Sequence, residues 1–277
     1  MLRILVSIAA CLVVTGCATT RLPGNIADGI LSNTDLEVVG DGLPTYLITL
    51  DGLVNTYPRR VGILATAAEL NSAYAGVFVE SPERQRHFTA KALDLSMRAA
   101  CRDIRALCNP RQQTVIELEE NLANINRTRH AESLYLLGST WASYIQTHSD
   151  DWNAVAELAK VQRILERQVL LDPSYSNGMG QLYLGVLASL LPPALGGQPE
   201  IARTYFESAI EQSEGRNLIV KVYYAQQYAR LLFDQELHDR LLKEVLAADP
   251  RAGTLTLQNT YAQQLAAELL ESGQYYF

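Results

Sequence analysis

Two segments of this chain end in the same dipeptide, which limits what they can fold into. Amphipathic stretches finish as LERQVLLDP at Pro173 and as LLKEVLAADP at Pro250. The residue before a proline is driven out of the α-helical region, so Asp-Pro ends a helix sharply. Runs of β-branched residues are short, and strict alternation of apolar and polar residues never lasts. The sequence therefore predicts an all-α protein whose helices have well-defined ends.

Apolar periodicity and helix-ending residues divide the chain into about eleven helices. Ser81 is an expected N-cap, with Pro82 at the first helical position. We expect helices over residues 42–56, 60–79, 82–103, 110–126, 130–147, 151–171, 175–191, 198–213, 217–232, 235–247 and 254–272.

These helices alternate between two kinds, which indicates a repeat. First helices are rich in Ala, Gly, Leu and Tyr, and second helices are more amphipathic. Two first helices carry a Leu-Gly pair, at Gly138 and Gly185. A glycine there costs about 1 kcal/mol relative to alanine, so we expect it to allow close helix approach. The pattern predicts an irregular tetratricopeptide-like helical-hairpin solenoid, with unit lengths that depart from the usual ~34 residues. A plain α-helical bundle is the alternative.

A proline- and glycine-rich insertion, LPPALGG, interrupts the array between two paired helices. Its prolines end the first helix, and its glycines permit turns with positive φ. Long loops of solenoids commonly lie on the functional face. We predict that this loop shapes the rim of a binding cavity or a contact between subunits, through Leu191, Pro192, Pro193, Gly196 and Gly197.

The first residues have the features of a secretory signal. Arg3 precedes an apolar run over residues 4–14 that is short for a bilayer span, and small residues follow it. The ending VTGC resembles a bacterial lipobox, in which Cys17 is acylated and becomes the first mature residue; Ala18 resembles an outer-membrane signal. We therefore expect a signal peptide over 1–16, a lipidated flexible tether over 17–40 and a helical domain over 41–277. A plain signal peptide or an uncleaved anchor is the alternative.

Two further cysteines, Cys101 and Cys108, lie seven positions apart. On one unbroken helix they would be about 10.5 Å apart by rise alone, whereas bonded cysteines have Cα atoms ~4.4–6.8 Å apart. A disulfide can still form if the helix ends between them, and an oxidising compartment would favour it. The alternative is two buried thiols.

The charge pattern and the missing motifs exclude several function classes. The net charge is −7 with lysine and arginine scattered, so nucleic acid is not an expected partner. None of the four histidines has metal-site spacing, and no nucleophile elbow or phosphate-binding loop is present. We expect no enzyme activity, no metal and no cofactor. The histidines are His87, His130, His148 and His238.

Aromatic residues are instead concentrated on the first helices. A solenoid's first helices line its concave surface, and a small-molecule site is usually apolar with a few polar groups. Tyrosine supplies a flat apolar body with a hydroxyl at its tip. For each of these residues, ordinary core packing is the alternative. The candidate cavity-lining residues are Tyr74, Trp141, Tyr144, Tyr183, Tyr223, Tyr224, Tyr228, Lys221 and Asn217.

The C-terminal half closely resembles the T-component family associated with tripartite ATP-independent periplasmic (TRAP) transporters. The resemblance rests on LPPALGG, the following ARTYFESAIEQSEGRN and the helices after it, and it continues more weakly towards residue 43. It implies a lipid-anchored periplasmic protein that forms a homotrimer and partners the transporter's solute-binding subunit. It also implies a channel-like cavity for a hydrophobic or amphipathic solute.

Two functions follow from these observations. The first is a TRAP transport accessory, attached by lipid to the inner leaflet of the outer membrane, which binds a solute, the periplasmic solute-binding subunit or both. The second is a generic tetratricopeptide scaffold that binds peptides or proteins during envelope assembly, because such a fold does not determine function.

Overall fold

The computed structural model describes residues 25–191 and 197–277, and within them all regular structure is helical. Residues 25–31 form a short helix. The α-helices that follow are α2 (Leu36–Thr56), α3 (Val61–Val77), α4 (Pro82–Asp103), α5 (Val115–Ala123), α6 (Ala131–Thr147), α7 (Trp152–Ala156), α8 (Leu158–Leu171), α9 (Met179–Ala188), α10 (Pro199–Gln212), α11 (Leu218–Tyr223), α12 (Gln235–Ala247) and α13 (Thr256–Tyr276). A π-helix, η6 (Tyr224–Ala229), continues α11, and a 3-10 turn, η4 (Tyr175–Gly178), precedes α9.

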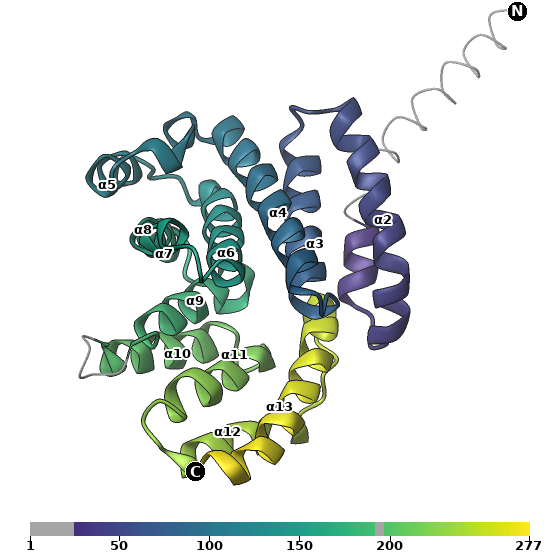
Figure 1. Ribbon diagram of the computed structural model, residues 1–277, viewed down its shortest axis with the longest axis vertical. Coiled ribbons are helices and arrows are strands. Elements are labelled where there is room, and N and C mark those ends of the chain that lie inside the picture. Colours follow the sequence, from purple (N-terminus) through teal and green to yellow (C-terminus); the bar gives the residue numbers. More distant parts are fainter. Residues whose placement is uncertain (1–24, 192–196) are drawn as a thin grey trace, which may run out of the picture.

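The helices stack as successive antiparallel hairpins that form a curved solenoid (Figure 1). First helices pack directly on one another along the array, α3 on α6, α6 on α9, α9 on α11 and α11 on α13. Figure 1 shows α6, α11 and α13 on the inner side of the curve, with α8 and α12 further out. The last helix, α13, also contacts α2. The array therefore curves until its two ends meet.

Local capping explains most helix boundaries. The side chains of Asp35, Ser81 and Asp234 each accept a hydrogen bond from a backbone N–H of the first turn, which satisfies a donor that the helix itself leaves free. Helix α8 ends before Asp172, whose backbone is extended immediately before Pro173. The predicted Asp-Pro stop is confirmed there, and α12 likewise ends shortly before Pro250.

Five expected helices differ clearly from the structure, and one of them is the helix expected over 175–191, which is reduced to the η4 turn and α9. Helix α2 begins at Leu36 rather than residue 42, because Asp35 caps it, and Pro44 lies inside it. Together with the helix over 25–31, it makes part of the expected tether helical. The helix expected over 151–171 breaks at Glu157 into α7 and α8. The helix expected over 110–126 is reduced to α5 and a preceding 3-10 turn. The helix expected over 217–232 turns into a π-helix.

A disulfide joins Cys101 and Cys108. Helix α4 ends at Asp103, and the chain then folds back through a 3-10 turn. This reversal brings the two Cα atoms to 4.4 Å, a separation that an uninterrupted helix would not allow.

Glycines on two first helices allow the close approach that the Leu-Gly pairs predict. A Cβ atom on Gly138 of α6 would lie 2.6 Å from Leu165 Cδ2 of α8, and one on Gly185 of α9 would lie 3.2 Å from the ring of Phe206 in α10. Both partner side chains are fully buried, so neither has free volume into which it can move.

We expect Gly138→Ala to destabilise the protein by about 1–2 kcal/mol, because overpacking outweighs the gain in helix propensity. Gly52→Ala in α2 is the matched control, since nothing lies within 4 Å of its added Cβ. It should stabilise the protein by about 0.5–1 kcal/mol through helix propensity alone. Urea unfolding of both variants measures the difference. Equal stabilisation by both would show that the α6–α8 contact tolerates a methyl group.

Candidate functional site on the inner surface of the solenoid

Six residues from successive first helices and η4 form a surface that we call the inner face. The tyrosine rings lie close together: the centroid of Tyr135 is 5.5 Å from that of Tyr175 and 6.4 Å from that of Tyr183. The helices that carry these residues contact one another in order, α3 with α6, α6 with α9, α9 with α11 and α11 with α13. The inner face consists of Glu69 (α3), Tyr135 (α6), Tyr175 (η4), Tyr183 (α9), Tyr223 (α11) and Tyr261 (α13).

The inner-face tyrosines are half-buried, yet their hydroxyls are poorly solvated. Burial raises the pKa of Tyr223 to about 12, with Tyr183 and Tyr261 adding to the shift. Burial likewise raises the pKa of Tyr135 well above its ordinary value and also raises that of Tyr183. A neutral phenol in such a setting offers an apolar ring and a hydrogen-bonding tip, which suits a ligand with a large apolar body and few polar atoms.

Glu69 is the carboxylate of the inner face. Its side chain retains water-accessible surface, but the surrounding protein raises its pKa, first by burial and then by repulsion from Glu132 and Asp28. The carboxyl group is therefore accessible to water but has protein close by on several sides. Such a perturbed group on a concave surface is a candidate functional residue.

We expect Glu69→Gln to stabilise the protein at neutral pH. A raised folded-state pKa means that the folded state prefers the protonated acid, so the ionised form costs stability above that pKa and nothing below the unfolded-state pKa. The gain in Tm over the wild type should therefore grow as the pH rises from about 4 to about 8. Thermal melts at several pH values measure this gain, and one that is independent of pH would contradict the account.

Five of the seven predicted aromatic residues lie away from the inner face, and two of these five, Tyr74 and Trp141, are packed in the core. Tyr74 is 7% exposed, and its ring packs edge-on against Phe88 at 5.0 Å. Trp141 has no exposed surface and belongs to the core, which corrects the expectation that it lines a cavity. Periodicity identifies both as inward-facing on their helices, but it does not distinguish core from a ligand surface.

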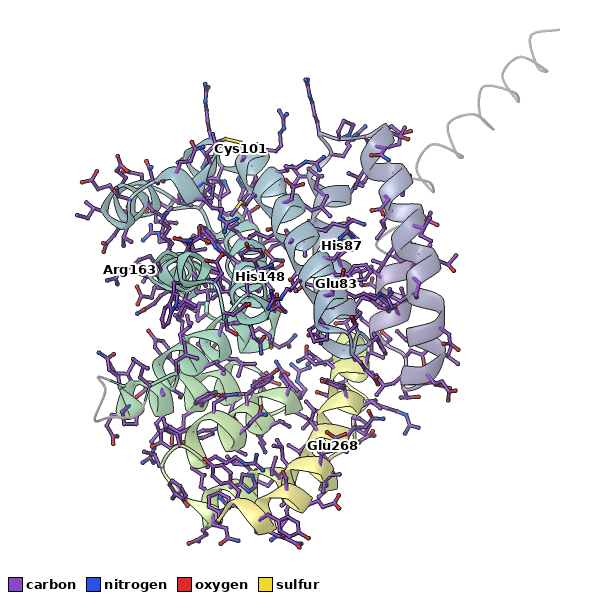
Figure 2. The ribbon with its side chains drawn as sticks, viewed as in Figure 1. Glu83, His87, Cys101, His148, Arg163 and Glu268 are labelled. Atoms are coloured by element: carbon purple, nitrogen blue, oxygen red, sulfur yellow. A yellow bond between two sulfur atoms is a disulfide. The ribbon has the colours of Figure 1, made fainter. Side chains whose placement is uncertain are left out.

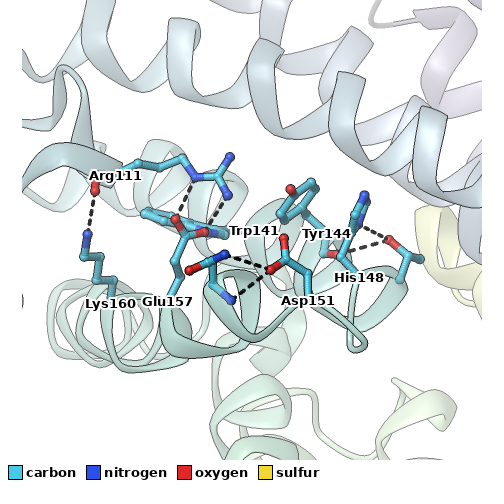
Figure 3. Close-up of polar contacts among 9 residues, drawn as sticks. Arg111, Trp141, Tyr144, His148, Asp151, Glu157 and Lys160 are labelled. Atoms are coloured by element: carbon cyan, nitrogen blue, oxygen red, sulfur yellow. Dashed lines mark hydrogen bonds and ion pairs between the residues drawn. The ribbon is translucent and has the colours of Figure 1, made fainter.

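Trp141 and Tyr144 take part in a polar cluster around Glu157 (Figure 3). The indole Nε1 of Trp141 donates to Glu157 Oε2 at 2.8 Å, and the Arg111 guanidinium binds both carboxylate oxygens, at 2.8 and 2.7 Å. Arg111 also lies 4.9 Å from the ring of Tyr144, which stacks on His148 at 4.0 Å. This cluster fastens the segment before α5 to α6 at the break between α7 and α8.

The other predicted residues line an outer groove or make structural contacts. Tyr224 and Tyr228 of η6 lie at the floor of a groove of about 580 Å³ between α10 and α12. Lys221 Nζ binds Glu244 Oε2 at 2.6 Å. Asn217 is buried, donates to the Asn177 carbonyl at 3.1 Å and accepts from Gln258 Nε2 at 2.6 Å. Lys221 and Asn217 therefore have structural partners within the protein.

Only Tyr183 and Tyr223 of the predicted residues lie on the inner face. Tyr135 is missing from the predicted set although a signal was available, because Leu134-Tyr135-Leu136 and Leu182-Tyr183-Leu184 repeat the same tripeptide before the close-packing glycine. Tyr175 and Glu69 had no such signal.

The family motif loop and the lipid site are largely outside the described residues. Cys17, Pro192, Pro193 and Gly196 fall there, and only Leu191 and Gly197 at the edges of the loop are described. Leu191 is exposed and Gly197 is half-buried.

A family model for the TRAP transporter T-component matches residues 32–277. The chain belongs to this family. No curated protein was found to match the sequence. As a T-component, the protein is an accessory of a TRAP transport system. The matched region includes α2 to α13 and therefore the whole inner face.

The described part of the T-component has neither a membrane-spanning helix nor a cluster of metal-ligand residues. None of its helices there is long and apolar enough to cross a membrane. Among the same residues, no group of three or more His, Cys, Asp or Glu side chains could hold a metal ion.

Proposed function

We propose that this T-component binds a hydrophobic or amphipathic solute at its inner face and exchanges it with the periplasmic solute-binding subunit of its TRAP transporter. The observation that carries the proposal is the group of half-buried tyrosines, drawn from five elements, in which the ring of Tyr135 lies 5.5 Å from that of Tyr175 and 6.4 Å from that of Tyr183. Burial raises the pKa of the hydroxyls in this group. An apolar solute that covers these half-buried rings removes their remaining exposed surface and its own from water, which favours binding.

The proposal includes a location and an assembly. Acylation of Cys17 anchors the protein in the inner leaflet of the outer membrane, since several acyl chains on one residue give stable attachment. The protein forms a homotrimer, and the solute-binding subunit docks on it. Light scattering on the purified protein tests the trimer, and mass spectrometry of the N-terminal peptide from the producing cell tests the lipid.

Binding of N-phenyl-1-naphthylamine, a neutral apolar fluorophore, tests the inner face directly. We expect fluorescence enhancement with the wild type, and about tenfold weaker binding by Tyr135→Ala and Tyr183→Ala, since tenfold corresponds to about 1.4 kcal/mol of lost contact. Tyr276→Ala is the matched control, because Tyr276 is exposed near the C-terminus on α13. Circular dichroism would verify that all three variants fold.

Two outcomes would contradict the proposal. Equal binding by all three variants would place the fluorophore elsewhere. Absence of apolar ligand binding, together with capture of extended peptides, would favour the peptide-binding scaffold instead.

A further inference from the structure

Six arginines lie at one end of the solenoid, which we call the arginine end. They come from the α2–α3 connection, from the end of α4 and from the segment before α6. All six are exposed. They are Arg59, Arg60, Arg102, Arg105, Arg127 and Arg129.

Contacts between the helices place these three segments together. Asp103 accepts from Ser133, Ser96 bonds to Thr140, and Thr89 bonds to Thr147. The order of these pairs shows that α4 and α6 are antiparallel, so the residues before α6 lie beside the end of α4. Figure 1 shows the α2–α3 connection at this same end, and Figure 2 places Cys101 there.

The arginine end differs from the rest of the protein in how its cations are paired. Within residues 25–191 and 197–277, none of the six side chains has a carboxylate, carbonyl or ring partner. Almost every other arginine in those ranges has one. Arg86 and Arg203, for example, bind carboxylates at 2.8 Å, Arg167 and Arg230 bind backbone carbonyls, and Arg240 is the exception. A protein with net charge −7 thus concentrates its unpaired cations at one end.

Two features favour a surface partner for this end. The disulfide between Cys101 and Cys108 closes the loop that carries Arg102 and Arg105, so these guanidinium groups project from a constrained loop. Tyr57, which is 48% exposed, is two positions before Arg59 in the chain. Tyrosine next to arginine is the composition found where proteins meet the lipid headgroup region.

We propose that the arginine end lies on an anionic lipid surface and orients the protein on the membrane that carries its acyl anchor. This inference rests on the lipid attachment proposed above. Each arginine near an anionic bilayer contributes a favourable charge interaction that decays within a Debye length. An even distribution over three helix ends suits a flat, diffuse negative surface better than one compact acidic ligand.

The reach of the chain is compatible with this orientation. The helix over 25–31 packs on the same core cluster as α2, and the 21 residues of α2 span ~31 Å. The eight residues from Cys17 to residue 25 can span at most about 28 Å. The extended tether is thus about 3 Å shorter than α2, so its reach is comparable with the distance between the two ends of this helix.

Vesicle co-sedimentation tests the proposal. The chain from residue 17 onward, which holds every described residue, would carry Cys17→Ser so that no acyl group contributes. We expect more than about tenfold stronger binding to phosphatidylcholine vesicles with about 30% phosphatidylglycerol than to phosphatidylcholine alone. Raising the NaCl concentration from about 0.1 M to about 1 M shortens the Debye length from about 10 Å to about 3 Å and should abolish this preference.

Two variants with equal charge change separate a local surface from net charge. The first carries Arg59→Gln, Arg60→Gln, Arg102→Gln and Arg105→Gln, and should lose about tenfold or more of its binding to the anionic vesicles. The control carries Arg216→Gln, Arg240→Gln, Lys243→Gln and Arg251→Gln and should bind as the wild type does. Circular dichroism would show that both fold.

Equal loss in both variants, or no preference of the wild type for anionic vesicles, would overturn the proposal. Fluorophore binding by the inner face, measured on the same samples, keeps the two proposals separate. If the protein binds the fluorophore but not the vesicles, only the proposed membrane orientation is overturned. If it binds the vesicles but not the fluorophore, only the proposed solute binding is overturned.

Discussion

Replacing Phe206 with alanine is expected to lower the free energy of unfolding by about 3–5 kcal/mol, the usual cost of truncating a fully buried phenylalanine. Phe206 has no exposed surface, and its ring stacks on Tyr224 at a centroid distance of 4.9 Å. The same ring lies against Gly185, where even a single added carbon would lie 3.2 Å from three ring atoms. The surrounding helices are held together on both sides of the ring, so they cannot easily collapse into the cavity.

Phe233→Ala is the matched control for this prediction. Phe233 has the same side chain but is 70% exposed, and its ring contacts those of Tyr276 and Phe277 near the C-terminus. We expect its replacement to change the stability by no more than about 1 kcal/mol. Guanidinium unfolding followed by circular dichroism measures both variants. Similar midpoints for the two variants would mean that the Phe206 site repacks, and would contradict the rigid α9–α10 contact.

Gly178→Ala is expected to destabilise the protein by about 2–5 kcal/mol, the sum of two separate costs. The first is conformational, because Gly178 has a φ of +77°, where a Cβ atom crowds the backbone. The second is steric, because the added Cβ would lie 2.7 Å from the carbonyl oxygen of Ala209 and 3.0 Å from its Cα. Backbone atoms of α10 cannot rotate away as a side-chain tip can.

Gly253→Ala separates these two costs. Gly253 has a similar φ of +61°, but nothing lies within 4 Å of its added Cβ. It should therefore show only the conformational cost, about 1–2 kcal/mol. The difference between the two variants, measured as the shift in urea midpoint at constant m-value, reports the contact between η4 and α10. Equal destabilisation would contradict the steric account.

Helix boundaries could be predicted from the sequence wherever a local interaction decides them. Ser81 and Pro82 begin α4 as expected, and Asp-Pro ends α8 at residue 171. Each of these signals acts within one turn of the chain, so no distant partner can override it. Asp35 is also a local signal, and it explains why α2 begins earlier than its apolar pattern indicated.

The break at Glu157 and the π-helix depend instead on distant residues. Glu157 binds Arg111 and Trp141, which are 46 and 16 positions away. The π-helical turn places Tyr224 against Phe206 of another helix. No window of local sequence contains these partners, so periodicity alone predicts one continuous helix in both places.

The sequence by itself determined the all-α class, the hairpin repeat, the close-packing glycines and the family, because each depends on spacing along the chain. Only the tertiary structure decided which aromatic residues form the candidate site. Trp141 and Tyr135 lie on the same helix, yet Trp141 is core and Tyr135 is on the inner face. Helical periodicity shows that a side chain faces inward, but the curvature of the whole array determines whether it meets another helix or the concave surface.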